Sequence, residues 1–316
     1  MPTALAAEVA RVYYLGDCLP STSPIGYIGD DPALDVMAVP ATVHDGYFTY
    51  SEAQRALRLY LPRTYESLAE GELILLSDVR ADTLPAKWLS WFSSSVDEGG
   101  LGLMMIGGIL SFGGYSDSPT WDITSIGPML PVNLMDGLTE STFWKPVVVS
   151  SEDPLMTALP WETCPSFGGY NVVTPKDGSR LLAKTGDPKG NPFMAFWTVG
   201  NGRSFAFCTD WTPGWGVDFM DWDFYADFTV YSVYYACGRE IPQDLALMHL
   251  IRTEMIAYTS QRDILVSFIG FVEKVGANLA RLEEAIKDVG DIRAKADEHY
   301  ILQEYEDCVA APCGCP

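Results

Sequence analysis

ELILLSDVRADTL (residues 72–84) and EGGLGLMMIGGILSFGG (residues 98–114) are the two stretches of sequence that decide the fold. Each contains a short apolar run, and the runs stop at Ser77-Asp78 and at Gly107-Gly108. The segment between them places apolar residues at the three- and four-residue spacing of a helix, namely Trp88, Leu89, Phe92 and Val96. A strand, a helix and a second strand in this order form the unit from which parallel sheets are built. The sequence therefore predicts an α/β protein with a mostly parallel sheet.

The ends of the predicted strands indicate where a functional site should lie. In open α/β sheets, ligands bind beyond the carboxyl ends of the strands. Asp78 and Gly107 follow two of these strands, and Asp210 follows a third predicted strand at 204–208. If the strands are neighbours, the carboxylates of Asp78 and Asp210 converge. Such a pair could hold a polar ligand or a metal ion, or it could cap helix N-termini and loop N–H groups.

The composition of the 316 residues limits the classes of function. An apolar fraction of 48% is ordinary for a globular protein, but 42 acidic and 20 basic residues give a formal net charge of -22. A surface this acidic repels phosphate backbones and anionic lipids, so we expect no nucleic acid and no membrane as partner. The sequence has no run of about 18 apolar residues and no signal-peptide pattern, which predicts a cytoplasmic protein.

The last quarter of the chain differs in pattern from the rest. After a first domain at 1–240, residues 241–316 contain few glycines and are typical of a helical extension with a cysteine-containing tail. Apolar residues step alternately by four and three along this extension, at Phe268, Val272, Val275, Leu279, Leu282, Ile286 and Val289. The spacing is typical of a coiled-coil seam. We expect 241–307 to mediate homo-oligomerisation, and the alternative is a helical hairpin within one chain.

Several short motifs occur one after another in a recognisable order. LILLSDV (73–79) and GGLGLMMIGGILSFGG (99–114) are followed by LPW (159–161), GGYN (168–171), GNGRSFAFCTD (200–210) and PGW (213–215). With these motifs, the chain resembles the glutamine amidotransferase-like family, a branch of the class I glutamine amidotransferase superfamily, over roughly residues 10–238. The resemblance implies a flavodoxin-like α/β fold in which helices flank the sheet.

Two departures from the superfamily's pattern argue against glutaminase activity. Members that hydrolyse glutamine carry a nucleophilic cysteine after the central strand, whereas residues 103–111 contain no cysteine. Relatives often carry Pro-His-Trp where this chain has Pro213-Gly214-Trp215, and glycine has no side chain that could act as a base. The resemblance therefore implies a pseudoenzyme that has lost the glutaminase machinery.

Other groups near the predicted strand ends could still carry chemistry. Ser111 is a candidate nucleophile, although Gly108 lies three residues before it and the segment is not a G-x-S-x-G elbow; the alternative is a loop or cap hydroxyl. Gly107 and Gly108 could bring backbone N–H groups close to an anion, or could only allow a tight turn. Trp211 and Trp215 could line the mouth of a pocket, or could belong to the core.

The cysteines form no strong metal or disulfide pattern. They number seven, so they cannot all pair within the chain, and Cys208 at a strand end is typical of a packed core thiol. Cys308, Cys313 and Cys315 could bind a metal with a fourth ligand such as His299, form a disulfide, or stay free. Because their spacing fits no strong zinc pattern, we expect no metal and no cofactor.

Two functions are consistent with these observations. The first is a non-catalytic binding or assembly protein, which uses its helical extension to oligomerise. The second is a hydrolase, or another enzyme that processes a small molecule, with Asp78, Ser111 or Asp210 as its catalytic candidates. The candidates for binding a small polar ligand are Asp78, Gly107, Gly108, Ser111, Asp210, Trp211 and Trp215.

Overall fold

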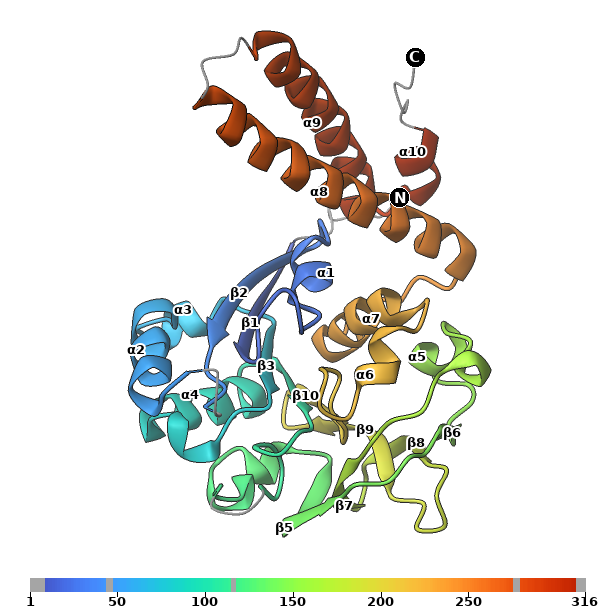
Figure 1. Ribbon diagram of the computed structural model, residues 1–316. Coiled ribbons are helices and arrows are strands. Elements are labelled where there is room, and N and C mark those ends of the chain that lie inside the picture. The colour runs from blue at the N-terminus through green and yellow to red at the C-terminus, as the bar shows by residue number, and fades with distance from the viewer. Residues whose placement is uncertain (1–8, 44–47, 115–117, 275–278, 311–316) are drawn as a thin grey trace, which may run out of the picture. The chain divides into compact units, whose positions relative to one another are not determined.

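The computed structural model describes residues 9–43, 48–114, 118–274 and 279–310. The chain forms two compact units. The larger, called the α/β unit, comprises Ala10–Ile28 and Val36–Gln243. The smaller, called the helical unit, is formed by the described residues of Met1–Val9, Gly29–Asp35 and Asp244–Pro316. Figure 1 labels the helices and strands of both units.

An eight-stranded sheet forms the centre of the α/β unit, with the strand order β2-β1-β3-β4-β10-β9-β8-β6. Its strands are β1 (Ala10–Gly16), β2 (Leu34–Pro40), β3 (Leu73–Ser77), β4 (Gly102–Ile106), β6 (Pro146–Val148), β8 (Arg180–Thr185), β9 (Pro192–Val199) and β10 (Gly202–Phe207). Strands β1, β3, β4 and β10 lie side by side and run parallel. β3 and β4 are short, apolar and buried along their whole length, as expected for strands covered on both faces. The α/β class, the mostly parallel sheet and the central positions of the three predicted strands are confirmed.

From β10 to the β6 edge of the sheet, the strands pair in the antiparallel direction. β10 pairs with β9, β9 with β8 and β8 with β6, each in the antiparallel direction. The turn Gly200-Asn201 joins β9 to β10, and Gly200 has a φ of 54°, which glycine adopts without strain. A connection this short can only reverse the chain. A separate two-stranded sheet pairs β5 (Val132–Glu140) with β7 (Tyr170–Pro175).

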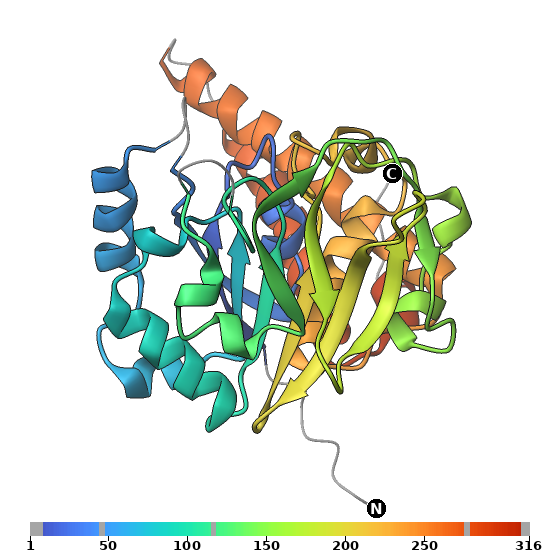
Figure 2. The same cartoon turned by 90° about the horizontal axis from the view of Figure 1, so that it is seen from below.

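Helices lie on both sides of the sheet of the α/β unit (Figures 1 and 2). They are α1 (Ile25–Gly29), α2 (Tyr50–Tyr60), α3 (Tyr65–Ala69), α4 (Ala86–Asp97), α5 (Pro154–Thr157), α6 (Val217–Met220) and α7 (Tyr225–Cys237). Four 3₁₀ turns are also described, at Ala81–Thr83, Trp121–Ile123, Gly127–Met129 and Trp161–Thr163. The flavodoxin-like arrangement that the resemblance implied is thus present.

The alternation of side chains along the strands explains the two helical layers. On one face, Leu57 of α2, Leu68 of α3 and Phe92 of α4 belong to one buried cluster with Leu76 of β3 and Met105 of β4. On the other face, α7 packs against the same central strands, and its rings contact the rings of β10. Both faces of the central strands are therefore covered, which is why these strands carry almost no polar residue.

Among its described residues, the helical unit contains the helices α8 (Leu245–Glu273), α9 (Ala280–Ile301) and α10 (Tyr305–Ala310). The side chain of Asp244 caps the start of α8, because its Oδ1 accepts the N–H of Leu247 at 3.1 Å. α10 packs against both α8 and α9. None of the helices in the described part of the chain is both long and apolar enough to cross a bilayer.

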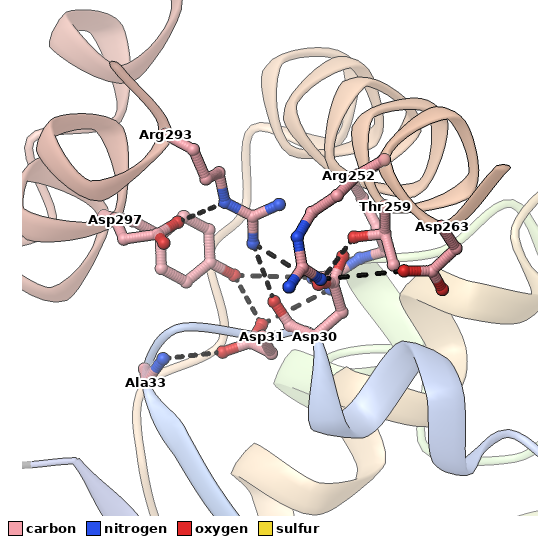
Figure 3. Close-up of polar contacts among 10 residues, drawn as sticks. Asp30, Asp31, Ala33, Arg252, Thr259, Asp263, Arg293 and Asp297 are labelled. Carbon is pink, nitrogen blue, oxygen red and sulfur yellow. Dashed lines mark hydrogen bonds and ion pairs between the residues drawn. The ribbon is translucent and has the colours of Figure 1, made fainter. Parts of the chain in front are cut away.

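A buried ion pair ties the segment Gly29–Asp35 to the helices of the same unit (Figure 3). Arg252 of α8 is 4% exposed and lies 3.3 Å from the carboxylate of Asp31. Tyr300 of α9 donates its hydroxyl to the same carboxylate at 2.7 Å. Because a buried carboxylate is costly without partners, these contacts hold the three segments together.

A second, partly buried set of charges lies beside this pair (Figure 3). Arg293 of α9 bonds the carboxylate of Asp297 at 2.6 Å and lies 3.5 Å from the carboxylate of Asp30. Thr259 of α8 donates its hydroxyl to Asp30 at 2.9 Å. Residues 30 and 31 are thus each bonded to both long helices of the unit.

The apolar seam predicted at 268–289 does not lie on a single helix. α8 ends at Glu273 and α9 begins at Ala280, and the seam residue Val275 lies outside the described residues. The intervening sequence, VGAN at 275–278, contains glycine and asparagine, which are weak helix formers and favour helix ends. This local preference is the physical reason why the heptad pattern does not continue as one helix.

The C-terminal part of the predicted seam faces a neighbouring helix of its own chain. Leu282, Ile286 and Val289 of α9 line a groove together with Tyr258 and Leu265 of α8. The two helices therefore share part of their apolar surface within the chain, as in the hairpin alternative.

Replacing Arg252 by alanine should strongly destabilise the helical unit. The change leaves the buried carboxylate of Asp31 without this arginine, and removing one partner of a buried ion pair costs about 3–5 kcal/mol. Arg262→Ala on the same helix is the matched control, because Arg262 forms an exposed pair with Asp263, which contributes little. Urea unfolding followed by far-ultraviolet circular dichroism measures both variants. Equal losses of stability would contradict a structural role for the buried pair.

Candidate functional site

A cavity of about 150 Å³ lies at the carboxyl edge of the parallel strands. The four strands end in register there, because Gly16 pairs with Ser77, Ser77 with Ile106, and Ile106 with Phe207. The residues that follow these strand ends therefore meet at one place. The cavity is lined by Asp17, Thr42, Asp78, Gly108, Ile109, Asp210, Thr212, Pro213, Gly214 and Trp215.

Two wider depressions on the α/β unit are less suited to a functional site. One, of about 370 Å³, lies beside Arg203 near the start of β10, and the other, of about 530 Å³, lies against α4 beside Leu89. Neither is lined by residues that directly follow the parallel strands. The smaller cavity is the one into which polar side chains converge, and we take it as the candidate site.

Asp78 is fixed at the wall of the cavity by an uncommon backbone conformation. It follows β3 with a φ of 49°, in the left-handed region that few residues other than glycine adopt. Its Oδ1 accepts the N–H of Leu110 at 2.7 Å, and its carbonyl oxygen accepts the hydroxyl of Thr42 at 3.0 Å. The carboxylate also lies against Gly108, where a Cβ atom would collide with it. The glycine at position 108 therefore makes room for the carboxylate.

Asp210 is 7% exposed and lies in a tight turn after β10. Its Oδ1 accepts both the N–H of Thr212, at 2.8 Å, and the hydroxyl of Thr212, at 2.7 Å. Its Oδ2 lies beside Gly214, where a Cβ atom would be 2.5 Å from that oxygen. A histidine at position 214 would displace this carboxylate, so the glycine at this position and the buried Asp210 fit each other.

Asp17 is a third carboxylate of the cavity. It follows β1 in the same way that Asp78 follows β3, and it is 5% exposed. Its Oδ1 accepts the N–H of Leu19 at 3.4 Å. Three strand ends thus each contribute one aspartate to the same small space.

Burial raises the proton affinity of all three carboxyl groups, and repulsion between like charges adds to it at Asp78 and Asp210. Burial raises the pKa of Asp210 to about 7, although the hydrogen bonds from Thr212 act in the opposite direction. Burial, together with the charge of Asp210, raises the pKa of Asp78 well above its usual range. Burial also raises the pKa of Asp17. The cavity therefore retains protons close to neutral pH, as expected when like charges share a poorly solvated space.

The turn after β4 is held by side chains of the protein. Asn171 accepts the N–H of Gly108 at 3.1 Å and donates its amide to the carbonyl of Gly108 at 2.9 Å. The N–H of Leu110 is bonded to Asp78, and the N–H of Gly107 is bonded to the carbonyl of Phe207 at 2.8 Å. Backbone N–H groups at such a turn are the usual donors of an oxyanion hole. In this protein the N–H groups of Gly107, Gly108 and Leu110 are already occupied.

Three residues singled out in the sequence do not line the cavity. Ser111 is 1% exposed, and its hydroxyl has no hydrogen-bond partner among the described residues. Trp211 is buried, donates to Ser77 Oγ at 3.0 Å and stacks on Tyr14. Gly107 is not among the residues that line the cavity. The sequence-derived candidates that do line it are Asp78, Gly108, Asp210 and Trp215.

Other residues of the cavity were not singled out in the sequence. Asp17 carried a usable signal, because it directly follows a predicted strand, as Asp78 does. Thr42 and Thr212 reach the cavity from loops, and no periodicity in the sequence places a loop residue.

One group of metal-type ligands in the described part of the chain has all its ligand atoms within 4.8 Å of one another: His299, Glu304 and Asp307 of the helical unit. His299 Nδ1 lies 2.8 Å from Glu304 Oε2, and the thiol of Cys308 is directed at the carbonyl of Ala296, at 3.3 Å. Cys313 and Cys315 lie outside the described residues. Each interpretation of the cysteine tail therefore stays a prediction.

Comparisons with known proteins concern mainly the α/β unit. The model of a family described as "Putative glutamine amidotransferase" matches residues 41–235. Cytoplasmic Protein STM1381 from Salmonella typhimurium LT2 is similar at 23% identity and a TM-score of 0.59, over 72% of this chain and 99% of that one. Cytoplasmic Protein STM3548 from Salmonella typhimurium is similar at 21% identity and a TM-score of 0.60, over 71% and 98%. No curated protein matches this chain. At these identities the two structures show a shared fold.

The protons held in the cavity should make stability depend on pH. A carboxyl whose pKa is raised by folding contributes stability that is fully present below about pH 4 and is lost as the pH rises through the folded value, which for Asp210 is about 7. The free energy of unfolding should therefore fall between roughly pH 5 and pH 8. In Asp210→Asn this fall should be shallower, by at most about 1.4 kcal/mol per pH unit for one proton.

Urea titrations at several pH values measure this dependence. Asp223→Asn is the matched control, because it removes the same kind of carboxyl group at an exposed position. The control should keep the slope of the parent protein. A slope in Asp210→Asn equal to that of the parent would mean that Asp210 is already ionised at pH 5 in the folded state.

Proposed function

The chain belongs to the family described as "Putative glutamine amidotransferase", and on this premise we propose that it is a non-catalytic member. In this proposal the α/β unit binds a small polar ligand in the strand-end cavity, and the helical unit mediates self-assembly. The observation that carries the first part is the set of groups that line the cavity. They are three carboxylates, two hydroxyls and apolar or aromatic groups, with no thiol and no imidazole among the described residues that line it.

Hydrolysis of glutamine through a thioester requires a thiolate, a base and an oxyanion hole. Cys208, the thiol that follows β10, is fully buried, and burial raises its pKa far above the physiological range. The N–H groups of Gly108 and Leu110 are bonded to side chains of the protein. The thiolate and the oxyanion hole are therefore unsupported at this edge of the sheet, whereas binding of a ligand by the carboxylates needs neither of them.

The second candidate function is a hydrolase that uses Asp210 as a general base. One observation favours it: a pKa of about 7 suits proton transfer at neutral pH. The nucleophile considered with it, Ser111, is 1% exposed and does not line the cavity. The binding function therefore has the stronger support.

Glutaminase activity should be absent. Purified protein incubated with glutamine should release no ammonia above the spontaneous rate, because the cavity holds no thiolate. A coupled glutamate dehydrogenase assay measures the ammonia, and a known glutaminase serves as the positive control. Turnover near the ordinary enzymatic range, about 1–1000 per second, would contradict the proposal. Its loss in Ser111→Ala or in Cys208→Ala would then identify the nucleophile.

The second half of α8 supports the proposal of self-assembly. The stretch ILVSFIGFV (264–272) carries no charge, in a chain whose net charge is -22. Ile264, Phe268 and Phe271 recur at helical spacing and are 69%, 53% and 65% exposed. A second copy of this chain is the partner that fits, because two highly acidic molecules can approach closely only where neither carries charge. Burial of these side chains would provide the driving force.

Phe268→Asp combined with Phe271→Asp should dissociate the assembly into monomers. The added charges would have to be buried at the contact, which is strongly unfavourable. Light scattering coupled to gel filtration gives the mass, which should fall from a multiple of 34.8 kDa to 34.8 kDa itself. Thr253→Asp with Ser260→Asp adds the same charge at exposed polar positions of α8 outside 264–272 and should leave the mass unchanged. A parent protein that is already a monomer would refute self-assembly.

We also propose that the protein is located in the cytoplasm. The two similar Salmonella proteins are each called a cytoplasmic protein, which supports this location.

A further inference from the structure

The walls of the strand-end cavity carry charge of one sign. Asp17, Asp78 and Asp210 line it, and none of the described residues that line it is lysine, arginine or histidine. The N–H groups of Gly108 and Leu110 are bonded within the protein, so the cavity offers a ligand mainly oxygen acceptors. An occupant must therefore donate hydrogen bonds. A positive charge on it would also relieve the repulsion among the carboxylates.

The spacing of the carboxylates distinguishes a divalent metal ion from an organic cation as the occupant of the cavity. A divalent metal ion needs its oxygen ligands at about 2.0–2.6 Å, so these oxygens must lie close to one another. In the described part of the chain, His299, Glu304 and Asp307 of the helical unit form the group whose three ligand atoms lie within 4.8 Å of one another. The carboxylate oxygens of the three aspartates in the cavity do not meet this limit and are spaced more widely. Wider spacing suits an ammonium group, because N–H···O distances of about 2.7–3.2 Å are longer than metal–oxygen distances.

The cavity also has an apolar and aromatic side. Ile109, Pro213 and Trp215 line it together with the aspartates. The face of an indole ring attracts organic cations, and aliphatic carbons pack well against such side chains. This observation is independent of the carboxylates. It suits an organic cation better than a hydrated metal ion.

The volume of the cavity limits the size of the occupant. An engineered protein cavity of about 150 Å³ holds one benzene molecule, which has about six non-hydrogen atoms. The strand-end cavity has the same volume, about 150 Å³. A ligand buried within it should therefore be no larger than about six non-hydrogen atoms.

We propose, as a refinement that rests on the ligand binding proposed above, that the cavity takes a small aliphatic amine. Its ammonium group lies among Asp17, Asp78 and Asp210, and its carbon atoms lie against Trp215 and Ile109. This assigns the chemical class of the ligand from charge, spacing, aromatic lining and volume together.

Binding of such an amine should strengthen as the pH rises. The pKa of Asp210 is raised to about 7, so the ammonium group gains a charged partner as the pH passes that value. Tyr14, Cys18 and Tyr225 are the other titratable groups nearby, and burial raises the pKa of each above the physiological range. These three groups stay neutral between roughly pH 6 and pH 8. A change of affinity in this range therefore reports the carboxyl groups.

Three four-carbon compounds test the assignment by isothermal titration calorimetry on the full chain. They are 1,4-diaminobutane, butane-1,4-diol and butyrate, which carry positive, no and negative charge and all fall within the size limit given above. We expect binding of the diamine alone, and tighter binding at pH 8 than at pH 6. Asp210→Asn and Asp17→Asn should each weaken it by about tenfold or more. Asp223→Asn, an exposed position, should bind as the parent does.

The possible results separate the ligand class from the proposed function. The diol, or another uncharged polyol, could bind as tightly as the diamine and lose affinity in Trp215→Ala. This result would overturn the amine as the ligand and keep the binding function. Competition by Mg²⁺ or Ca²⁺ at lower concentration than the diamine would also overturn the amine, because the site would then prefer a metal ion. If neither the amine nor uncharged or anionic compounds bind at millimolar concentration, the amine and the binding function both fail.

Discussion

The parallel register of β1, β3, β4 and β10 is the constraint on which the α/β unit depends. Since Gly16, Ser77, Ile106 and Phe207 are aligned across the sheet, the residues after them cannot move apart without breaking backbone hydrogen bonds. Three aspartates are thereby forced into one small, poorly solvated space. Their raised proton affinity is a consequence of backbone pairing more than of any local sequence feature.

The sequence predicted which residues follow the ends of the central strands. The apolar runs before Asp78 and Asp210 marked two strand ends, and parallel pairing then required the two carboxylates to share an edge. A residue one position further into the turn is harder to place. Trp211 comes directly after Asp210, yet it turns away from the cavity and stacks on Tyr14 in the core. Side-chain direction in a turn depends on a few backbone dihedral angles that hydrophobic periodicity does not report.

In the helical extension too, hydrophobic periodicity predicted only part of the structure. A regular spacing of four and three predicted one continuous seam, but α8 ends at Glu273 and α9 begins at Ala280. Burial of a seam residue contributes about 1.5–3 kcal/mol, whereas glycine and asparagine reduce helix stability by smaller amounts each. Periodicity therefore predicted correctly that the described seam residues on α8 and α9 are helical, while the intrachain groove depended on which partner the apolar face could reach.

The ion pair between Asp31 and Arg252 joins positions that are 221 residues apart in the sequence. The helical unit is therefore discontinuous, with one short segment made early and its long helices made much later. During synthesis on the ribosome, every strand of the eight-stranded sheet is made before Arg252 is added. Until then the aspartates at 30 and 31 have no cation from α8 or α9 to pair with. The contacts of residues 30 and 31 with α8 and α9 can therefore form only after these helices have been synthesised. Formation of these contacts is the step that completes the helical unit.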